Sequence, residues 1–206
     1  MQGRRFELTA LAVALAALLC FIWLAQKVDH GETVRFDESV RNTLHSAAHP
    51  LLTTLFEAIT ALGSQAVVTG VSGSAALILF RQGRRAEALL IVIAMGGAEA
   101  WLYLLKAHFH RQRPEQFFPL PPLTSYSFPS GHALLSFCCY GMLAALARAR
   151  RTLVRIAAAA LILAIGLSRI YLGVHHSSDV IAGYLAAAAW MAGLAALYMR
   201  IVNMKR

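Results

Sequence analysis

Apolar residues gather into six long segments, and the short stretches between them hold most of the charged residues. Each segment is about 17 to 22 residues long, close to the length a helix needs to cross the hydrocarbon core of a bilayer. Only helices satisfy their own backbone polar groups over such lengths in lipid, so the pattern predicts six transmembrane helices in a bundle. The predicted spans are about 8–25, 62–80, 87–106, 131–147, 154–173 and 178–199.

The first apolar segment follows Arg4 and Arg5, as the apolar part of a secretory signal peptide would. It is longer than the usual signal core, and no small-residue cleavage pattern follows it. We therefore expect a retained first helix. The sequence contains no internal repeat, and the six segments leave no stretch long enough for a soluble domain. Residues 1–206 are therefore expected to form a single all-α membrane domain.

The segment from about 37 to 61 mixes charged and apolar residues and is interrupted at Pro50. Its apolar residues recur at helical spacing, which predicts one or two short interfacial helices along the outer membrane surface, within the first external loop. We expect these helices to serve packing. The next external loop, 107–129, contains Phe117, Phe118, Pro119, Pro121 and Pro122, and its prolines exclude a helix there.

Composition agrees with a membrane protein, since 58% of the residues are hydrophobic and only 14% are charged. A soluble domain carries about a quarter charged residues. The net charge of +9 is high enough to raise the question of nucleic acid binding. The basic residues form short clusters between apolar segments, however, so we expect the bilayer as partner and no nucleic acid.

Lysine and arginine are divided unequally between the two sides of the predicted bundle, twelve against seven. Cytoplasmic loops carry the excess of basic residues, so both termini are expected in the cytoplasm of a multi-pass protein of the cell (inner) membrane. Lys106, Arg111, Arg113 and Arg169 lie on the opposite side, against this rule, and need another explanation. The twelve are Arg4, Arg5, Arg81, Arg84, Arg85, Arg148, Arg150, Arg151, Arg155, Arg200, Lys205 and Arg206.

Three polar motifs lie at helix ends on that external side, in residues 106–114, 129–132 and 168–179. They contain the residue types that bind and transfer a phosphate group. Forked arginines and a lysine stabilise phosphate oxygens, and a helix that begins with Ser-Gly offers a hydroxyl and free N–H groups. The candidate phosphate-binding residues are Lys106, Arg113, Ser130, Gly131 and Arg169.

Two histidines of these motifs fit different catalytic roles. His175 and Asp179 are four residues apart, so on a helix they share a face, and the carboxylate can orient the imidazole. This favours His175 as the nucleophile. His132 has no such partner in sequence, and we expect it to protonate the departing oxygen and then to activate water. These positions predict an active site on the periplasmic or extracellular side.

His108 and His110 have a spacing that can bind a metal, but Glu115 is the one carboxylate nearby. No metal and no cofactor is therefore expected. Glu99 lies within the third span, seven residues before Lys106, and an intramembrane carboxylate is a functional candidate. The alternative for Glu99 is a buried polar network.

Together the three motifs resemble the three-part signature of the type-2 phosphatidic acid phosphatase superfamily, with no signature position missing. The resemblance implies that His175 is phosphorylated, Asp179 orients it, and His132 is the general acid and base. It implies metal-independent hydrolysis of a lipid phosphate or pyrophosphate. Similar proteins act on phosphatidic acid, phosphatidylglycerol phosphate or undecaprenyl pyrophosphate, and the sequence leaves the choice among these open.

Other functions share parts of this pattern. A lipid phosphotransferase would use the same phosphohistidine with another acceptor, and the sequence does not distinguish it. An anion channel or carrier also places cations at helix ends, but it does not explain the His175–Asp179 spacing. A vanadate-dependent oxidase shares the pocket type on a soluble fold, which the six spans disfavour. Oligomeric state stays open.

Overall fold

Each predicted apolar segment corresponds to one helix of the computed structural model, which describes residues 2–118 and 124–204. All regular structure in these residues is helical, which confirms the all-α prediction. Pro119, Pro121, Pro122, Lys205 and Arg206 lie outside the described residues. The helices are α1 (Gln2–Asp29), α2 (Val34–Ser46), α3 (Pro50–Leu62), α4 (Gln65–Arg81), α5 (Arg85–Phe109), α6 (Gly131–Leu146), α7 (Arg151–Tyr171) and α8 (Ser177–Met204).

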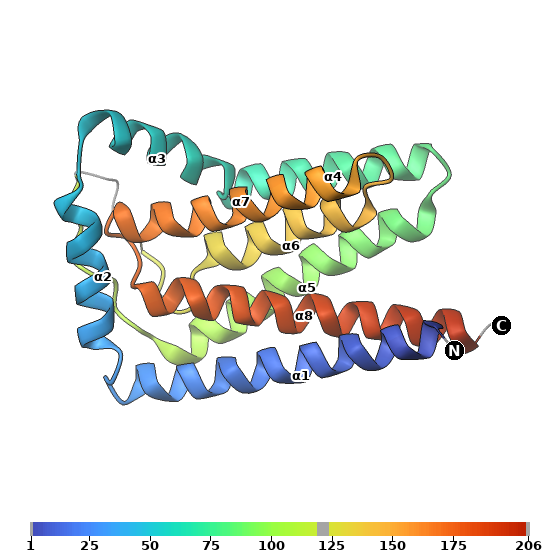
Figure 1. Ribbon diagram of the computed structural model, residues 1–206, viewed down its shortest axis with the longest axis horizontal. Helices are drawn as coiled ribbons and strands as arrows, with labels where there is room; N and C mark the ends of the chain where they lie inside the picture. Colours follow the sequence, from blue (N-terminus) through green and yellow to red (C-terminus); the bar gives the residue numbers. More distant parts are fainter. Residues whose placement is uncertain (1, 119–123, 205–206) are drawn as a thin grey trace.

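Six separate spans are not confirmed. Among the described residues, α1, α5, α7 and α8 are each long and apolar enough to cross a membrane. The bent pair α3–α4 can be counted as a fifth span. Helix α6 is apolar but has only 16 residues, and it begins further inside the bundle than α7 and α8 extend (Figure 1). The first residues of α6 therefore lie inside the bundle and not at its end.

The predicted interfacial segment forms two helices that differ in orientation. Helix α2 lies across one end of the bundle, whereas α3 lies beside α7 (Figure 1). Helix α3 is bent by 46° from α4, with the break at residues 63–64. The location of α3 at the membrane surface stays a prediction. Its apolar residues pack in part on Tyr171 of α7, with the ring of Phe56 at 4.6 Å between centroids.

Small side chains allow the long helices to pack closely. Helix α1 runs along α8, and α6 lies between α5 on one side and α7 on the other (Figure 1). Alanines of α5 and α8 are almost fully buried, including Ala94, Ala98, Ala182 and Ala187. Small residues at such interfaces are typical of helices that pack within a membrane. Many leucines on the outer faces of α1 and α5 are exposed, as expected for a surface in contact with lipid.

The loops of the bundle divide into two groups. The start of α1, the α4–α5 turn, the α6–α7 turn and the end of α8 lie at one end (Figure 1). Helix α2, the end of α5, and the α7–α8 turn lie at the other. The three predicted motifs therefore come to the same end of the bundle, opposite the chain termini.

Candidate active site

One cavity of about 170 Å³ brings all three motifs together. It lies between the ends of α5, α6 and α7, and it is lined in part by residues at the α3–α4 break. Ser130 and Asp179, the two predicted site residues that do not line it, are fully buried. The predicted residues that line it are Lys106, Arg113, Gly131, His132, Arg169 and His175.

His175 lies in the turn between α7 and α8. Helix α7 ends at Tyr171, and Gly173 adopts a φ of +71°, which allows the chain to reverse toward α8. The helical spacing suggested that His175 lies on the same helix as Asp179. In the structure His175 instead precedes α8. The predicted pair still forms, because Nδ1 of His175 lies 3.3 Å from Oδ2 of Asp179.

The neighbours of His175 define its tautomer. Nη1 of Arg113 lies 3.1 Å from Nε2 of His175, and a guanidinium group only donates hydrogen bonds. Nε2 is therefore the acceptor and carries the free electron pair, while Nδ1 carries the proton that faces Asp179. Burial lowers the pKa of His175 to about 3, although Asp179 acts in the opposite direction. The imidazole is thus neutral, with Nε2 available as a nucleophile.

Three cations line the cavity, namely Lys106, Arg113 and Arg169. No carboxylate in the described part of the chain forms an ion pair with any of them. Lys106 donates to the carbonyl of Tyr126. Arg113 donates to the carbonyls of Ser125 (2.8 Å) and Val174 (2.7 Å). These contacts fix both side chains while their positive charges remain available to an anion.

Arg169 is the most deeply buried of the three, with 6% of its surface exposed. Its Nη1 donates to the hydroxyl of Thr60 at 2.7 Å, and its Nε is buried without a partner among the described residues. A buried guanidinium N–H without an acceptor is costly. This group is therefore suited to bind an oxygen of an anion in the cavity.

The second motif starts α6 and also contacts the third. The hydroxyl of Ser130 caps the helix by accepting from the N–H of Ala133 at 3.5 Å. The N–H of Ser130 donates to the carbonyl of Asp179 at 2.9 Å. A side chain at Gly131 would contact Leu102 at 3.0 Å, so glycine keeps the helix start close to α5. The positive end of α6 therefore faces the cavity beside His132.

Several residues of the site were not found from the sequence. Thr60 and Ser125 hold Arg169 and Arg113, but neither belongs to a recognisable motif. Arg111 forms ion pairs with Asp37 at 2.9 Å and with Asp179 at 2.6 Å. In the sequence, Arg111 was noticeable only as a basic residue on the predicted external side, where the charge rule expects few. Nothing in the sequence indicated a role for Asp37.

Glu99 belongs to a polar contact beside the cavity. Its Oε2 accepts from Nε2 of Gln65 at 3.1 Å, and Gln65 lines the cavity. Its Oε1 is buried without a partner among the described residues. Glu99 is thus connected to the cavity wall through Gln65, and its role stays a prediction.

Residues 2–118 and 124–204 contain no group of three or more His, Cys, Asp or Glu side chains arranged to hold a metal ion. His110 directly follows α5 and adopts a left-handed conformation with φ of 46°, and its Nδ1 lies 3.1 Å from the carbonyl oxygen of His108. His110 packs edge-on against Tyr126.

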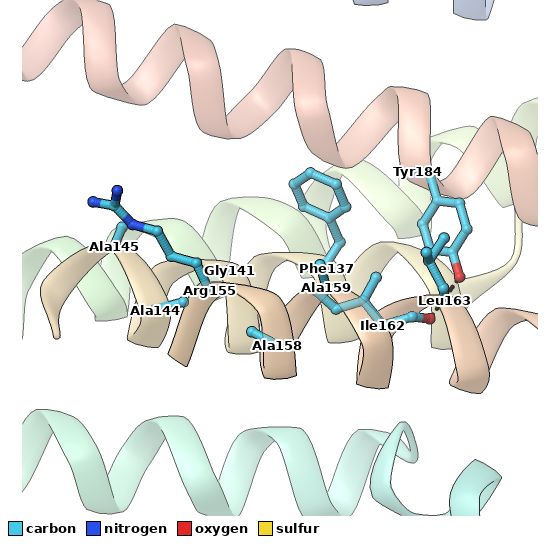
Figure 2. A pocket seen from close by; sticks show the side chains of 10 residues that line it. All are labelled: Phe137, Gly141, Ala144, Ala145, Arg155, Ala158, Ala159, Ile162, Leu163 and Tyr184. Carbon is cyan, nitrogen blue, oxygen red and sulfur yellow. Dashed lines mark hydrogen bonds between the residues drawn. The ribbon is translucent and has the colours of Figure 1, made fainter. Parts of the chain in front are cut away.

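A larger cavity, of about 650 Å³, opens between α6, α7 and α8 (Figure 2). Its lining is apolar apart from Arg155 at one end and the hydroxyl of Tyr184 at the other (Figure 2). That hydroxyl donates to the carbonyl of Ile162 at 2.6 Å. The groove lacks the cations and histidines that phosphate chemistry requires, so the smaller, polar cavity is the candidate active site.

Known proteins resemble this chain in sequence and in fold. The model of the PAP2 superfamily matches residues 87–204, which include all three motifs. Phosphatidylglycerophosphatase B of Bacillus subtilis (strain 168) is 27% identical over 177 residues, which cover 82% of this chain and 87% of that protein.

Two solved structures are similar in fold. The crystal structure of a transmembrane PAP2-type phosphatidylglycerolphosphate phosphatase from Bacillus subtilis superposes with a TM-score of 0.76 at 25% identity. The superposition covers 94% of this chain and 96% of that one. The crystal structure of Aquifex aeolicus LpxE gives a TM-score of 0.62 at 26% identity, covering 78% of this chain and 93% of that one.

Proposed function

The chain belongs to the PAP2 superfamily and is a membrane phosphatase, and on that premise we propose that it hydrolyses a lipid phosphate monoester or lipid pyrophosphate through a phosphohistidine at His175. The observation that carries the proposal is the position of His175. Its Nδ1 faces Asp179 and its Nε2 faces a cavity lined by Lys106, Arg113 and Arg169.

The first step is attack on phosphorus by Nε2 of His175. The N–P bond forms as the bond between phosphorus and the leaving oxygen breaks, and the electron pair stays with that oxygen. Attack requires phosphorus in front of Nε2, so Nη1 of Arg113 transfers its hydrogen bond to a phosphate oxygen. The phosphorylated ring is positively charged, and Asp179 stabilises it through the Nδ1–H bond.

His132 carries the proton in both steps. As the imidazolium it gives a proton to the leaving oxygen and thereby becomes the neutral imidazole, which is a base. In the second step it takes a proton from water as the water oxygen attacks phosphorus, which breaks the N–P bond and releases inorganic phosphate. Its position in the wall of the same cavity as His175 supports this role.

The cations stabilise the charge of the transition state. Three equatorial oxygens of the transferred group require fixed donors, and Lys106, Arg113 and Arg169 surround the cavity. The N–H groups at the start of α6, near Ser130 and Gly131, add the positive end of a helix dipole. A pocket of about 170 Å³ leaves room for the phosphate, while the lipid tail stays outside it.

Phosphatidylglycerol phosphate is the first substrate to test, because both Bacillus subtilis relatives are named for its hydrolysis. Phosphatidic acid and undecaprenyl pyrophosphate present the same terminal phosphate to the pocket. We place the site at the periplasmic or extracellular face, since the basic clusters of the opposite end mark the cytoplasmic side. Both termini are then cytoplasmic.

The test is phosphate release by the purified protein, in chelator, across these three lipids. His175→Ala is expected to abolish release while the protein keeps its elution profile and melting temperature, because no other group attacks phosphorus. His30→Ala, at an exposed position of the α1–α2 turn, is the matched control and should retain wild-type turnover. Wild-type turnover by His175→Ala, or strict dependence on a divalent ion, would contradict the proposal.

The same assay separates hydrolysis from transfer. Water is the acceptor in a hydrolase, so inorganic phosphate accumulates without an added alcohol. A phosphotransferase would instead release phosphate only slowly until a second lipid or a saccharide is supplied.

A further inference from the structure

Arg111 bridges two buried carboxylates that come from distant parts of the chain. Its Nη2 donates to Oδ2 of Asp37 at 2.9 Å, and its Nη1 donates to Oδ1 of Asp179 at 2.6 Å. Asp37 is 2% exposed and Asp179 is 0% exposed. Two carboxylates so close together and so well buried would repel each other strongly without the cation between them.

Ser178 links the same groups a second time. Its hydroxyl accepts from Nη1 of Arg111 at 2.8 Å and donates to Oδ2 of Asp37 at 2.7 Å. Its backbone N–H donates to Oδ1 of Asp37 at 2.8 Å. Asp37 therefore lies at the N-terminus of α8, where the helix dipole favours a negative charge. Helix α2 is thereby bound to the turn that carries His175.

The two oxygens of Asp179 have separate partners. Oδ1 accepts from Arg111, whereas Oδ2 accepts from the N–H of His176 at 2.9 Å and faces Nδ1 of His175 at 3.3 Å. The guanidinium thus fixes the rotation of the carboxylate from one side. This rotation decides which oxygen His175 meets and at what distance.

We propose that Arg111 and Asp37 are positioning residues of the active site, which hold Asp179 so that its Oδ2 stays on the imidazole of His175. The inference rests on the proposed function, because it concerns the same nucleophile. Neither residue lines the cavity, so both act through Asp179. It also extends the working site to α2, outside the residues 87–204 that match the family model.

The test compares kcat and KM of Arg111→Gln, Arg111→Lys and Asp37→Asn, each measured per folded molecule. Arg111→Gln removes the guanidinium group that donates to both carboxylates, and we expect kcat to fall about 100-fold with KM nearly unchanged. The reason is that a shift of about 1 Å in a catalytic group lowers the rate by about that factor. Arg111→Lys should recover part of kcat, because the charge remains while the second planar donor is lost. Asp37→Asn should also lower kcat, by a smaller factor.

Arg35→Gln and Glu38→Gln are the matched controls, since both change a charge at exposed positions of α2 next to Asp37. Both are expected to keep wild-type kcat. A purely structural role for Arg111 predicts a lower melting temperature and a smaller folded fraction, but an unchanged kcat per folded molecule. That result, or a rise in KM at constant kcat, would overturn the inference.

His175→Ala, included in the same series, separates two failures. Wild-type turnover by that variant would mean that the proposed function is wrong. An inactive His175→Ala beside an Arg111→Gln with kcat within about twofold of wild type would overturn the positioning role alone. Should Arg111→Gln not fold, Asp37→Asn and Arg111→Lys decide the question by the same criteria.

Discussion

The imidazole of His175 is held between a carboxylate and a guanidinium, and this arrangement sets its protonation. Arg113 donates to Nε2 and Asp179 accepts from Nδ1, so each ring nitrogen has one role. Burial keeps the pKa of the ring well below its ordinary value of 6.5. In the proposed mechanism a neutral imidazole with a free Nε2 attacks phosphorus, and this environment provides that form before substrate binds.

The pH dependence of the reaction follows from the causes of this shift. Because the pKa of His175 lies below 6.5, the ring stays neutral as the pH falls through 6.5, and attack is lost only at lower pH. Asp179→Asn removes the negative charge and weakens the hydrogen bond, both of which raise this pKa, while the burial that lowers the pKa remains. We expect the acid limb of kcat/KM to move to lower pH than in the wild type.

The measurement is the pH profile of both proteins on one lipid phosphate, so that titration of the substrate is common to both. The rate of Asp179→Asn should fall by about 100-fold or more, as expected when a general base or nucleophile loses its orienting partner. An acid limb that moves to higher pH would show that Asp179 does not raise the pKa of His175.

Residues close in sequence could be paired from the sequence, and distant ones could not. His175 and Asp179 are four apart, and any helical or turn geometry brings them near each other, so their contact was predictable. The Arg111–Asp37 pair joins residues 74 positions apart, and only the docking of α2 on α8 creates it. Asp37 lies among ordinary polar residues of an amphipathic helix, where nothing distinguishes it from Glu38.

At the scale of elements, the distance between α6 and α8 determines whether His132 and His175 share a cavity. The two helices meet at Gly183, where a Cβ atom would lie 2.7 Å from the carbonyl oxygen of Ser130 and 2.9 Å from Cβ of Ala133. The first of these is a backbone atom of the helix that carries His132, and it cannot move alone. A glycine is therefore required for this close approach.

Gly183→Ala is expected to push α8 away from the start of α6. The overpacking should lower the free energy of unfolding by about 1–3 kcal/mol and reduce phosphate release, because His132 moves relative to His175. Gly193→Ala is the control on the same helix, since its Cβ meets nothing within 4 Å. It should leave both quantities close to wild type.

Thermal unfolding in detergent and phosphate release check the two effects. Equal behaviour of Gly183→Ala and Gly193→Ala in both assays would contradict the importance of this contact.

The existence of the helices was predictable from apolar length, but their angles were not. For α1, α5, α7 and α8, most of the helix ends lie within a few residues of the predicted segment ends, because a bilayer requires long apolar helices. The apolar pattern of α3 predicts a helix with one apolar face, but it does not predict the direction of that helix. Its packing on α7 and the 46° bend from α4 depend on neighbours that the pattern does not specify.

At the scale of the whole molecule, the helix ends opposite the termini carry the cations that the charge rule left unexplained. One cavity is lined by Lys106, Arg113 and Arg169. Arg111 does not line this cavity but forms an ion pair with Asp179. Their presence at the end that is predicted to be external thus has a chemical reason. The motifs and the charge division predicted this gathering. The depth of the site could not be predicted, since it depends on how far the short α6 begins inside the bundle.

The measurement that tests the central claim most directly is identification of the phosphorylated residue. His132→Ala should still accept phosphate from a lipid pyrophosphate, whose lipid phosphate leaves easily, but should release it slowly because water is no longer activated. After a rapid quench of this variant with labelled substrate, we expect label on His175, stable in alkali and lost in acid. Label on any other residue, or turnover of the wild type without a covalent intermediate, would contradict the account.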